Sequence, residues 1–178
     1  MFKCLNSLRE TIFGDKQLAI AVKGMQCNFT SENLNIGLPI FTIHGNHDYP
    51  SNDFGKISVC DLLHASSYVN YFGKFSHFAV PSSKTVTVKP LIFRKKGAED
   101  GGMLAIYGLG YVKDFKLHKM LIDKLVCFEE PPQPENTTCI LIIHQNRYKK
   151  KGGVGASFEN CIHAEQLPNW MDLVIWGH

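Results

Sequence analysis

The chain has 178 residues, 44% of them hydrophobic and 20% charged, a composition typical of one globular domain. The formal net charge of +3 is too small to indicate a nucleic-acid partner by itself. Six widely spaced cysteines argue against a disulfide-stapled secreted domain, and the lack of an apolar run of about 18 residues predicts no transmembrane helix and no membrane partner.

The N-terminal part of the chain predicts one helix and two strands. Residues 2–12 carry apolar side chains at helical spacing. Residues 18–31 give no clear pattern, and we expect them to include a loop. Residues 33–36 predict a short strand, and the compact apolar run 39–44, closed by Gly45, predicts a buried strand that leads into a loop.

The middle of the chain continues with a helix and two strands. Residues 57–68 predict a helix that begins near Ser58 and Asp61, because both residue types favour helix N-termini. Residues 69–72 predict a short strand that ends before a glycine. Residues 86–93 alternate and are rich in β-forming residues, which predicts a further strand.

The C-terminal part alternates between strands and helices. Residues 103–107 predict a strand, and residues 115–125 predict a helix. Residues 139–144 predict a buried strand, and residues 161–166 a short helix. A last buried strand is predicted at residues 172–178. Because strands and helices interleave along the chain, the sequence predicts an α/β layered fold.

Candidate functional residues gather where predicted strands end. Three strands end in a histidine or an Asn-His pair, in the strings Gly45-Asn46-His47-Asp48, His144-Gln145-Asn146 and Gly177-His178. A single histidine at a strand end is more often a surface or capped residue than a ligand. Three such endings at matched places predict a shared metal site, because strand ends converge in a crevice and imidazole and amide oxygen suit Mn²⁺, Fe²⁺ or Zn²⁺.

These strings also carry a family resemblance. The string Gly45-Asn46-His47-Asp48 resembles the GNH[DE] motif of calcineurin-like metallophosphoesterases. Four further strings resemble the eukaryotic meiotic-recombination-eleven nuclease, at residues 68–73, 106–110, 143–147 and 172–178. The resemblance implies a calcineurin-like metallophosphoesterase fold, which is an α/β fold with a layered β-sandwich flanked by helices.

The resemblance assigns roles to individual residues. It implies that Asn46, His144 and His178 are ligands of one Mn²⁺ in a site that holds two ions in the intact family. It implies that His47 is the catalytic histidine, which faces the scissile phosphate and is not a ligand. Asp48 is expected to orient the loop by hydrogen bonds. The implied chemistry is two-metal hydrolysis of a phosphodiester.

The resemblance also implies parts that the chain lacks. The family's Asp-x-His motif and its metal-bridging Asp lie upstream of the helix that resembles residues 2–12, and a further histidine follows the one that resembles His178. We therefore expect residues 1–178 to be one partial domain with an incomplete fold, without its first strands and its C-terminal part. We also expect weak or no Mn²⁺ binding and no activity in the isolated chain.

Contacts with DNA and proteins follow from a basic loop and from the resemblance. Arg147, Lys149, Lys150 and Lys151 come directly after the His144 strand and could contact the DNA backbone, although a solvated charged loop is the alternative. The resemblance implies a homodimer through the helix at residues 57–68, a Rad-fifty type SMC ATPase and a nibrin-type adaptor as partners, and a nuclear location.

Three functions remain open at this point. The first is a manganese-dependent DNA nuclease, with exonuclease and endonuclease action, in double-strand break repair and recombination. The second is a phosphoesterase of the same superfamily that acts on a phosphoprotein or a small phosphodiester. The third is a catalytically dead fragment that acts as a DNA-binding and dimerisation module, which the absent ligands favour for the isolated chain.

Overall fold

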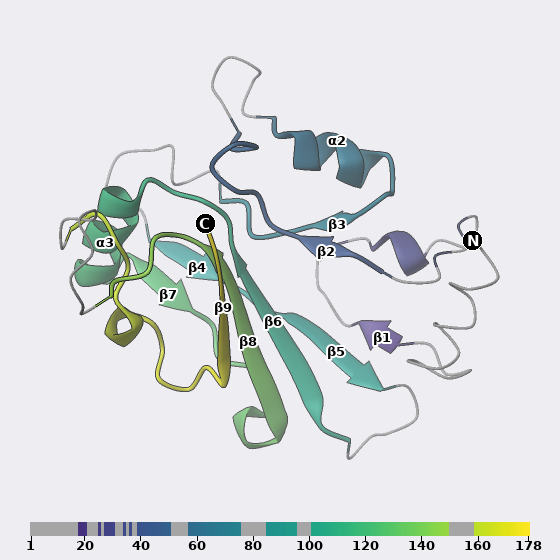
Figure 1. The fold of residues 1–178 in the computed structure, drawn as a ribbon. Coiled ribbons are helices and arrows are strands. Elements are labelled where there is room, and N and C mark those ends of the chain that lie inside the picture. The colour runs from purple at the N-terminus through teal and green to yellow at the C-terminus, as the bar shows by residue number, and fades with distance from the viewer. Residues whose placement is uncertain are drawn as a thin grey trace.

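The computed structural model describes residues 18–20, 25, 27–30, 34, 36, 39–50, 57–75, 85–95, 101–149 and 159–178. Within these ranges, strands form three sheets, and two α-helices and several 3-10 turns connect them (Figure 1). The helix expected at residues 2–12 lies outside the described residues. No helix in the described ranges is long and apolar enough to cross a membrane.

The largest sheet brings the candidate strand ends to one edge. It has the order β1-β5-β6-β8-β9, formed by β1 (Leu18–Ile20), β5 (Leu91–Lys95), β6 (Met103–Leu109), β8 (Thr137–His144) and β9 (Leu173–Gly177). Strands β6, β8 and β9 are parallel neighbours, and β1 and β5 run antiparallel to the strands they pair with. The carboxyl ends of β6, β8 and β9 therefore meet at the same edge of the sheet.

One face of this sheet forms the main core. Alternate residues of β6 and β8 point to this face, including Tyr107, Leu141 and Ile143, which are fully buried. Helix α3 (Asp114–Ile122) and the parallel pair of β4 (Val86–Val88) and β7 (Val126–Phe128) contribute buried residues to the same core. These elements lie on one side of the sheet in Figure 1.

A second, smaller unit packs on the opposite face of the sheet. Strands β2 (Phe41–Thr42) and β3 (Asn70–Tyr71) pair in parallel, and helix α2 (Val59–Ala65) connects them. Phe41 packs edge-to-face on Phe72 and on Phe93, with ring centroids 6.2 and 5.1 Å apart. This unit carries the Gly45–Asp48 turn, so its packing decides where the turn lies.

Two glycines allow the small unit to approach the sheet closely. Gly73 has φ +70°, and a Cβ there would lie 2.7 Å from the carbonyl carbon of Gly108. A Cβ at Gly108 would in turn lie 2.5 Å from the Phe72 ring. The N–H of Gly110 donates to the Gly73 carbonyl at 3.0 Å. The backbone of one unit therefore touches the backbone of the other where β6 ends.

The structure confirms the α/β class and several predicted elements. Helix α2 begins where the sequence predicts it, and Ser58 and Asp61 form a capping box there. Strands β3, β6, β8 and β9 and helix α3 form where the sequence predicts them, with shifted ends, and the short helix expected at residues 161–166 is a 3-10 turn over Ala164–Gln166. Strand β9 is not the buried strand that the sequence predicts, because it lies at the end of the sheet order and exposes Leu173 and Ile175.

Other predictions about the strands were wrong. The strand predicted at 39–44 is only Phe41–Thr42, and both residues are half-buried. The single strand predicted at 86–93 is two strands in different sheets, β4 and β5, separated by Lys89 and Pro90. Proline has no N–H to donate to a sheet, which explains the break. Leu34 and Ile36, within the predicted strand at 33–36, have no regular secondary structure.

Candidate active site

The structure brings three of the predicted site residues together. Asn46 follows β2, His144 ends β8 and His178 follows β9. The Asn46 Oδ1 lies 3.1 Å from the His144 Nε2. The rings of His144 and His178 stack with centroids 5.1 Å apart and an interplanar angle of 29°. Residues separated by about a hundred positions in the chain therefore share one edge of the sheet.

Two glycines form a cradle around the His144 ring. A Cβ at Gly45 would lie 2.9 Å from the His144 Cε1, and a Cβ at Gly177 would lie 2.8 Å from its Nδ1. Real side chains do not approach so closely, so both positions need glycine for this ring to stay where it is. The glycines that flank the predicted ligands thus have a steric role in addition to turning the chain.

The donor atoms fit one half of a divalent metal site. Adjacent ligand atoms on a metal with bonds of about 2.1 Å lie about 3 Å apart, as the oxygen of Asn46 and the nitrogen of His144 do. Burial, followed by the nearby His178, lowers the pKa of His144, which keeps its ring neutral and able to donate a lone pair.

Charge compensation is the part of the fit that these donors do not provide. Asn46, His144 and His178 are all neutral donors, whereas carboxylates usually offset the charge of a divalent ion. In the part of the chain that the structure describes, no three His, Cys, Asp or Glu side chains come together as a metal site. The three candidate ligands therefore bring neutral donor atoms together without a carboxylate among them.

His47 and Asp48 lie on the same turn and differ in their surroundings. His47 is exposed next to Asn46. Asp48 accepts hydrogen bonds from the Gly45 N–H at 2.9 Å and from the Cys60 Sγ at 3.1 Å. Burial raises the pKa of Asp48, but these two hydrogen bonds outweigh it and hold the pKa below its ordinary value. The carboxylate thus closes the turn, as the sequence predicts.

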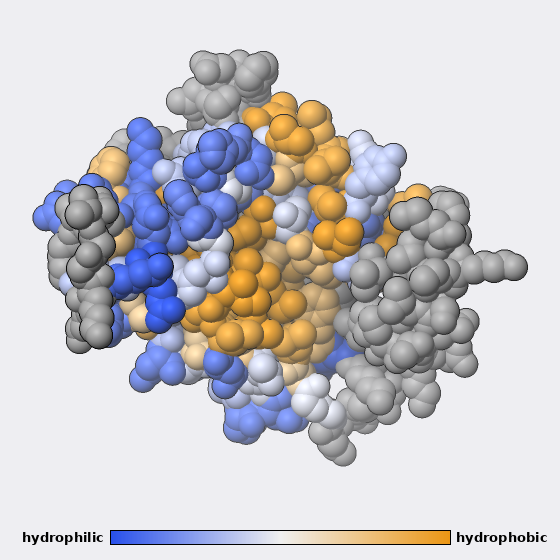
Figure 2. All heavy atoms as spheres, in the orientation of Figure 1, coloured by the Kyte–Doolittle hydropathy of each residue, from blue (hydrophilic) through white to orange (hydrophobic). Residues whose placement is uncertain are grey.

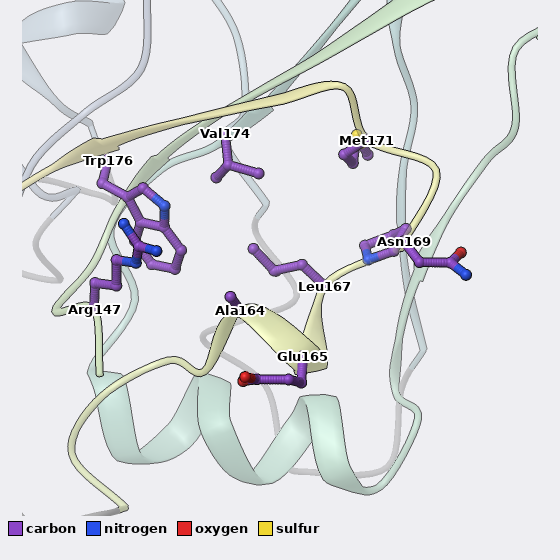
Figure 3. A pocket seen from close by; sticks show the side chains of 9 residues that line it. Arg147, Ala164, Glu165, Leu167, Asn169, Met171, Val174 and Trp176 are labelled. Atoms are coloured by element: carbon purple, nitrogen blue, oxygen red, sulfur yellow. The ribbon is translucent and has the colours of Figure 1, made fainter. Parts of the chain in front are cut away.

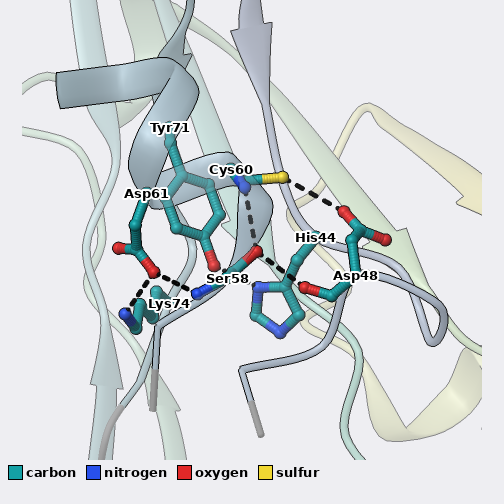
Figure 4. Close-up of polar contacts among 7 residues, drawn as sticks. All are labelled: His44, Asp48, Ser58, Cys60, Asp61, Tyr71 and Lys74. Atoms are coloured by element: carbon teal, nitrogen blue, oxygen red, sulfur yellow. Dashed lines mark hydrogen bonds and ion pairs between the residues drawn. The ribbon is translucent and has the colours of Figure 1, made fainter. Parts of the chain in front are cut away.

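A polar network attaches this turn to helix α2 (Figure 4). The Ser58 hydroxyl donates to the Asp48 carbonyl at 2.6 Å, and the Ser58 N–H donates to Asp61 at 2.7 Å. Lys74 forms an ion pair with the same Asp61 oxygen at 2.7 Å. Burial and the adjacent Asp48 raise the pKa of Cys60 to about 11, so its thiol keeps its proton at neutral pH.

His44 anchors the other end of the turn. Its Nε2 lies 3.2 Å from the Tyr111 carbonyl, which can only accept, so this nitrogen carries the proton. Its Nδ1 then accepts from the Tyr71 hydroxyl at 2.7 Å. Burial lowers the pKa of His44, so it is held as a neutral structural histidine.

Beyond β8, side chains fix the start of the predicted basic loop. The Asn146 side chain and backbone N–H both donate to Asp114 of α3, at 2.8 and 3.2 Å. Arg147 is exposed, and its guanidinium lies 5.7 Å from the centre of the Trp176 ring. Lys149 is exposed, while Lys150 and Lys151 lie outside the described residues.

A pocket opens beside Arg147 and Trp176 (Figure 3). Its volume is about 550 Å³, and its surface is half polar and half apolar, with Leu167, Met171 and Val174 on the apolar part. It lies along β9, on the same side of the sheet as the main core. The pocket therefore flanks the strand that ends in His178, without containing any of the three candidate ligands.

Sequence reasoning did not identify Tyr111 as a site residue. Its ring lies 6.3 Å from the ring of His144 and 6.0 Å from the ring of His178. Tyr111 comes just after β6, which pairs with β8. The parallel order of the strands could have pointed to it, because β6 ends at the same edge as β8 and β9.

Comparison with known families agrees with this arrangement. The sequence profile of the calcineurin-like phosphoesterase family matches residues 14–178. The chain belongs to the calcineurin-like phosphoesterase family. Membership implies hydrolysis of phosphoesters with the help of divalent metal ions, in keeping with the imidazole and amide donors gathered at the strand ends. The fold and superfamily predicted from the Gly45–Asp48 string are therefore confirmed.

The chain is also similar to double-strand break repair proteins. It is 34% identical over 189 residues to the repair protein mus-23 of Neurospora crassa, across 100% of this chain and 23% of that protein. It is 34% identical over 192 residues to MRE11 of Mus musculus, across 100% of this chain and 25% of that protein. MRE11 of Homo sapiens is 33% identical over 189 residues, across 98% of this chain and 24% of that protein.

These relatives confirm the resemblance to the meiotic-recombination-eleven family that the strings at residues 143–147 and 172–178 indicate. The chain spans about a quarter of the length of the curated relatives that it matches. All three relatives are double-strand break repair proteins by name. What a whole protein of that kind does is therefore a proposal for this chain.

Proposed function

We propose that this chain forms part of the active site of a manganese-dependent DNA nuclease that acts in double-strand break repair and recombination, as exonuclease and endonuclease. The observation that carries the proposal is the meeting of Asn46, His144 and His178 at the end of parallel strands, with His47 beside them. A phosphoesterase family and relatives named for double-strand break repair make DNA the preferred substrate over a phosphoprotein.

Each residue has a distinct part in this proposal. The Asn46 Oδ1 and the imidazoles of His144 and His178 would hold one Mn²⁺ of a pair. When bound, the ions supply an activated water and neutralise charge on the phosphoryl oxygens. His47 would give a proton to the leaving sugar oxygen. Asp48 would act only by fixing the turn through its hydrogen bonds to Gly45 and Cys60.

The DNA backbone would be held by the basic loop after β8. Arg147 and Lys149 are exposed and close in the chain to His144, and Lys150 and Lys151 would extend the same patch. Each phosphate contact releases counterions, so binding should weaken steeply with salt. Replacement of all four residues by Gln should reduce the salt dependence of DNA affinity more than it alters the fold.

A homodimer through α2 is the second element of the proposal. Helix α2 exposes a stripe of apolar side chains, with Val59 and Leu62 both 60% exposed and Leu63 next to them. Figure 2 shows hydrophobic surface over this helix. A stripe at helical spacing on the outside of a helix fits self-association. Leu62→Asp should give a monomer in sedimentation. The contacts of Cys60 with Asp48 and of Asp61 with Ser58 should remain, because Leu62 is not part of them.

Further partners and the location follow from the relatives alone. A Rad-fifty type SMC ATPase and a nibrin-type adaptor are proposed partners, and the nucleus is the proposed location, in keeping with relatives that are DNA repair proteins. Mixing the protein with each partner and measuring complex formation by sedimentation tests the two contacts separately.

A second candidate function is a non-catalytic module that dimerises and holds DNA. The neutral donor set at the strand ends favours it, because Asn46, His144 and His178 bring no negative charge to offset a divalent ion. Calorimetry with Mn²⁺ on this chain and on the full-length protein separates the two functions. The nuclease proposal expects Mn²⁺ binding by the full-length protein, and His47→Ala should keep that binding while it abolishes DNA cleavage.

Asn46→Ala and His144→Ala are the matched variants for that experiment. Both should weaken Mn²⁺ binding as well as cleavage, because they remove ligands. If the full-length protein binds no Mn²⁺, the histidines are structural and the nuclease proposal fails, whereas DNA binding without cleavage would favour the module.

A further inference from the structure

A continuous row of aromatic rings borders the candidate site. Tyr111 packs edge-to-face against His144 and His178, with interplanar angles of 83° and 61°. Tyr49 packs on Tyr111 with centroids 5.9 Å apart, and on His44 with centroids 5.8 Å apart. The row therefore runs from the candidate metal ligands, through Tyr111, to Tyr49.

Tyr49 is the open end of this row. It directly follows Asp48 and is 39% exposed, whereas Tyr111 is more buried. Its edge-to-face contacts hold the ring at a fixed angle, since Tyr111 lies at 89° to it and His44 at 61°. A large ring that is oriented by its neighbours and still open to solvent is suited to stack with a planar ligand.

We infer that Tyr49, with Tyr111 behind it, is a stacking platform for an unpaired nucleobase of the DNA strand whose phosphate lies at the candidate site. The inference rests on the proposed function, because it takes DNA as the substrate. Every base has a flat face that stacks on tyrosine, so the platform would orient the strand without reading its sequence. Tyrosine offers this area at a small cost in conformational entropy.

The platform selects the form of the DNA. A base inside a duplex is covered on both faces by its neighbours, so it must leave the stack before it can lie on Tyr49. The preferred ligand is therefore a single strand or a frayed end. Phosphate contacts from Arg147 and Lys149 depend on salt, whereas stacking does not, so the two contributions can be measured separately.

Fluorescence of 2-aminopurine in a short single-stranded oligonucleotide tests the inference. The oligonucleotide is titrated with the protein in the presence of a chelator, and its anisotropy is followed in parallel. Stacking on Tyr49 should quench the 2-aminopurine, and an abasic site in its place should weaken binding by about tenfold. The salt dependence of binding should be the same for both oligonucleotides.

Three variants at Tyr49 and one control separate stacking from packing. Tyr49→Phe should keep the quenching. Tyr49→Leu, which retains apolar volume, and Tyr49→Ala should both lose it and bind intact and abasic strands equally. Tyr68→Ala is the control, because Tyr68 is also an exposed tyrosine, at 72%. It lies beyond the C-terminal end of α2, whereas the first turn of α2 is the end that contacts the Asp48 turn, through Cys60.

The outcomes distinguish this inference from the proposed function. If the protein binds DNA but Tyr49→Leu quenches like the unchanged protein, the platform is wrong and the nuclease proposal stands. If Tyr68→Ala loses the quenching as fully as Tyr49→Ala, the base lies elsewhere. If the full-length protein binds no DNA even at low salt, both proposals fail.

Discussion

The two halves of the candidate site are built on different sheets and held by different means. Asn46 and His47 lie on a turn after β2, a strand of two residues, and side chains hold this turn from both ends. His144 ends β8 and His178 follows β9, and these two strands pair along five successive residues. The turn half therefore depends on individual side chains, whereas the strand half depends on backbone pairing and on its two glycines.

The contact between the halves should show the largest effect. Gly73→Ala places a Cβ 2.7 Å from the backbone of Gly108 at a positive φ, so the small unit must move away from the sheet. We expect a loss of about 3 kcal/mol in the free energy of unfolding. Chemical denaturation measures it. Gly102→Ala is the control, because its nearest contact would be 3.6 Å, and an equal loss there would contradict this account.

Removal of one anchor of the turn should have a smaller effect. Tyr71→Phe deletes the hydroxyl that donates to the His44 Nδ1 and leaves a buried acceptor unpaired. We expect a cost of about 2 kcal/mol in the free energy of unfolding. Tyr107→Phe on β6, the strand that pairs with β8, is a useful comparison, since its hydroxyl donates to a single backbone carbonyl, that of Glu129. Its cost should be lower than that of Tyr71→Phe, because Glu129 is exposed and water can replace the lost donor.

Stability should fall as the pH is lowered below the ordinary histidine range. Burial lowers the pKa of both His44 and His144 in the folded protein. In the unfolded chain the same histidines have a pKa of about 6.5. Between these two pKa values the unfolded chain binds more protons than the folded protein. The stability that the neutral histidines contribute above a pH of about 6.5 is therefore lost as the pH falls through their folded pKa. Denaturation curves at several pH values test this. A slope unchanged in His44→Gln would show that His44 does not contribute.

The smallest effect is expected from the thiol that contacts Asp48. Cys60→Ala removes the side-chain donor to the Asp48 carboxylate and leaves the hydrogen bond from the Gly45 N–H, and it should cost about 1 kcal/mol or less. Hydrogen exchange at the Gly45 N–H should become faster, because Asp48 is less well oriented. Cys60→Ser restores a donor and should restore slow exchange. Equal exchange in all three proteins would mean that the turn does not need helix α2.

The sequence predicted the strand half better than the turn half. Strands β8 and β9 are apolar runs at whose ends a histidine lies, and these matched endings alone predict that His144 and His178 converge in one crevice. The start of helix α2 near Ser58 and Asp61 could also be predicted, because both residues lie within one turn of the helix. These features depend on neighbours in the chain.

The remaining features depend on contacts between distant parts of the chain. The Cys60 thiol meets Asp48, and Tyr71 meets His44, because the small unit packs in one register that no local pattern fixes. Strand β7 has only three residues and gains its place by pairing with β4. The close approach of Gly73 to Gly108 likewise appears only when both units are in place.

The most direct test of the central claim is the broadening of side-chain NMR signals by Mn²⁺, which relaxes nuclei near it. In the full-length protein, the Asn46 side-chain amide and the rings of His144 and His178 should broaden first, at Mn²⁺ levels that leave the ring of His118 sharp. His118 is the internal control, because it is buried against the backbone of Cys161. Broadening that begins at His118, or uniformly along the chain, would contradict the metal site proposed at the strand ends.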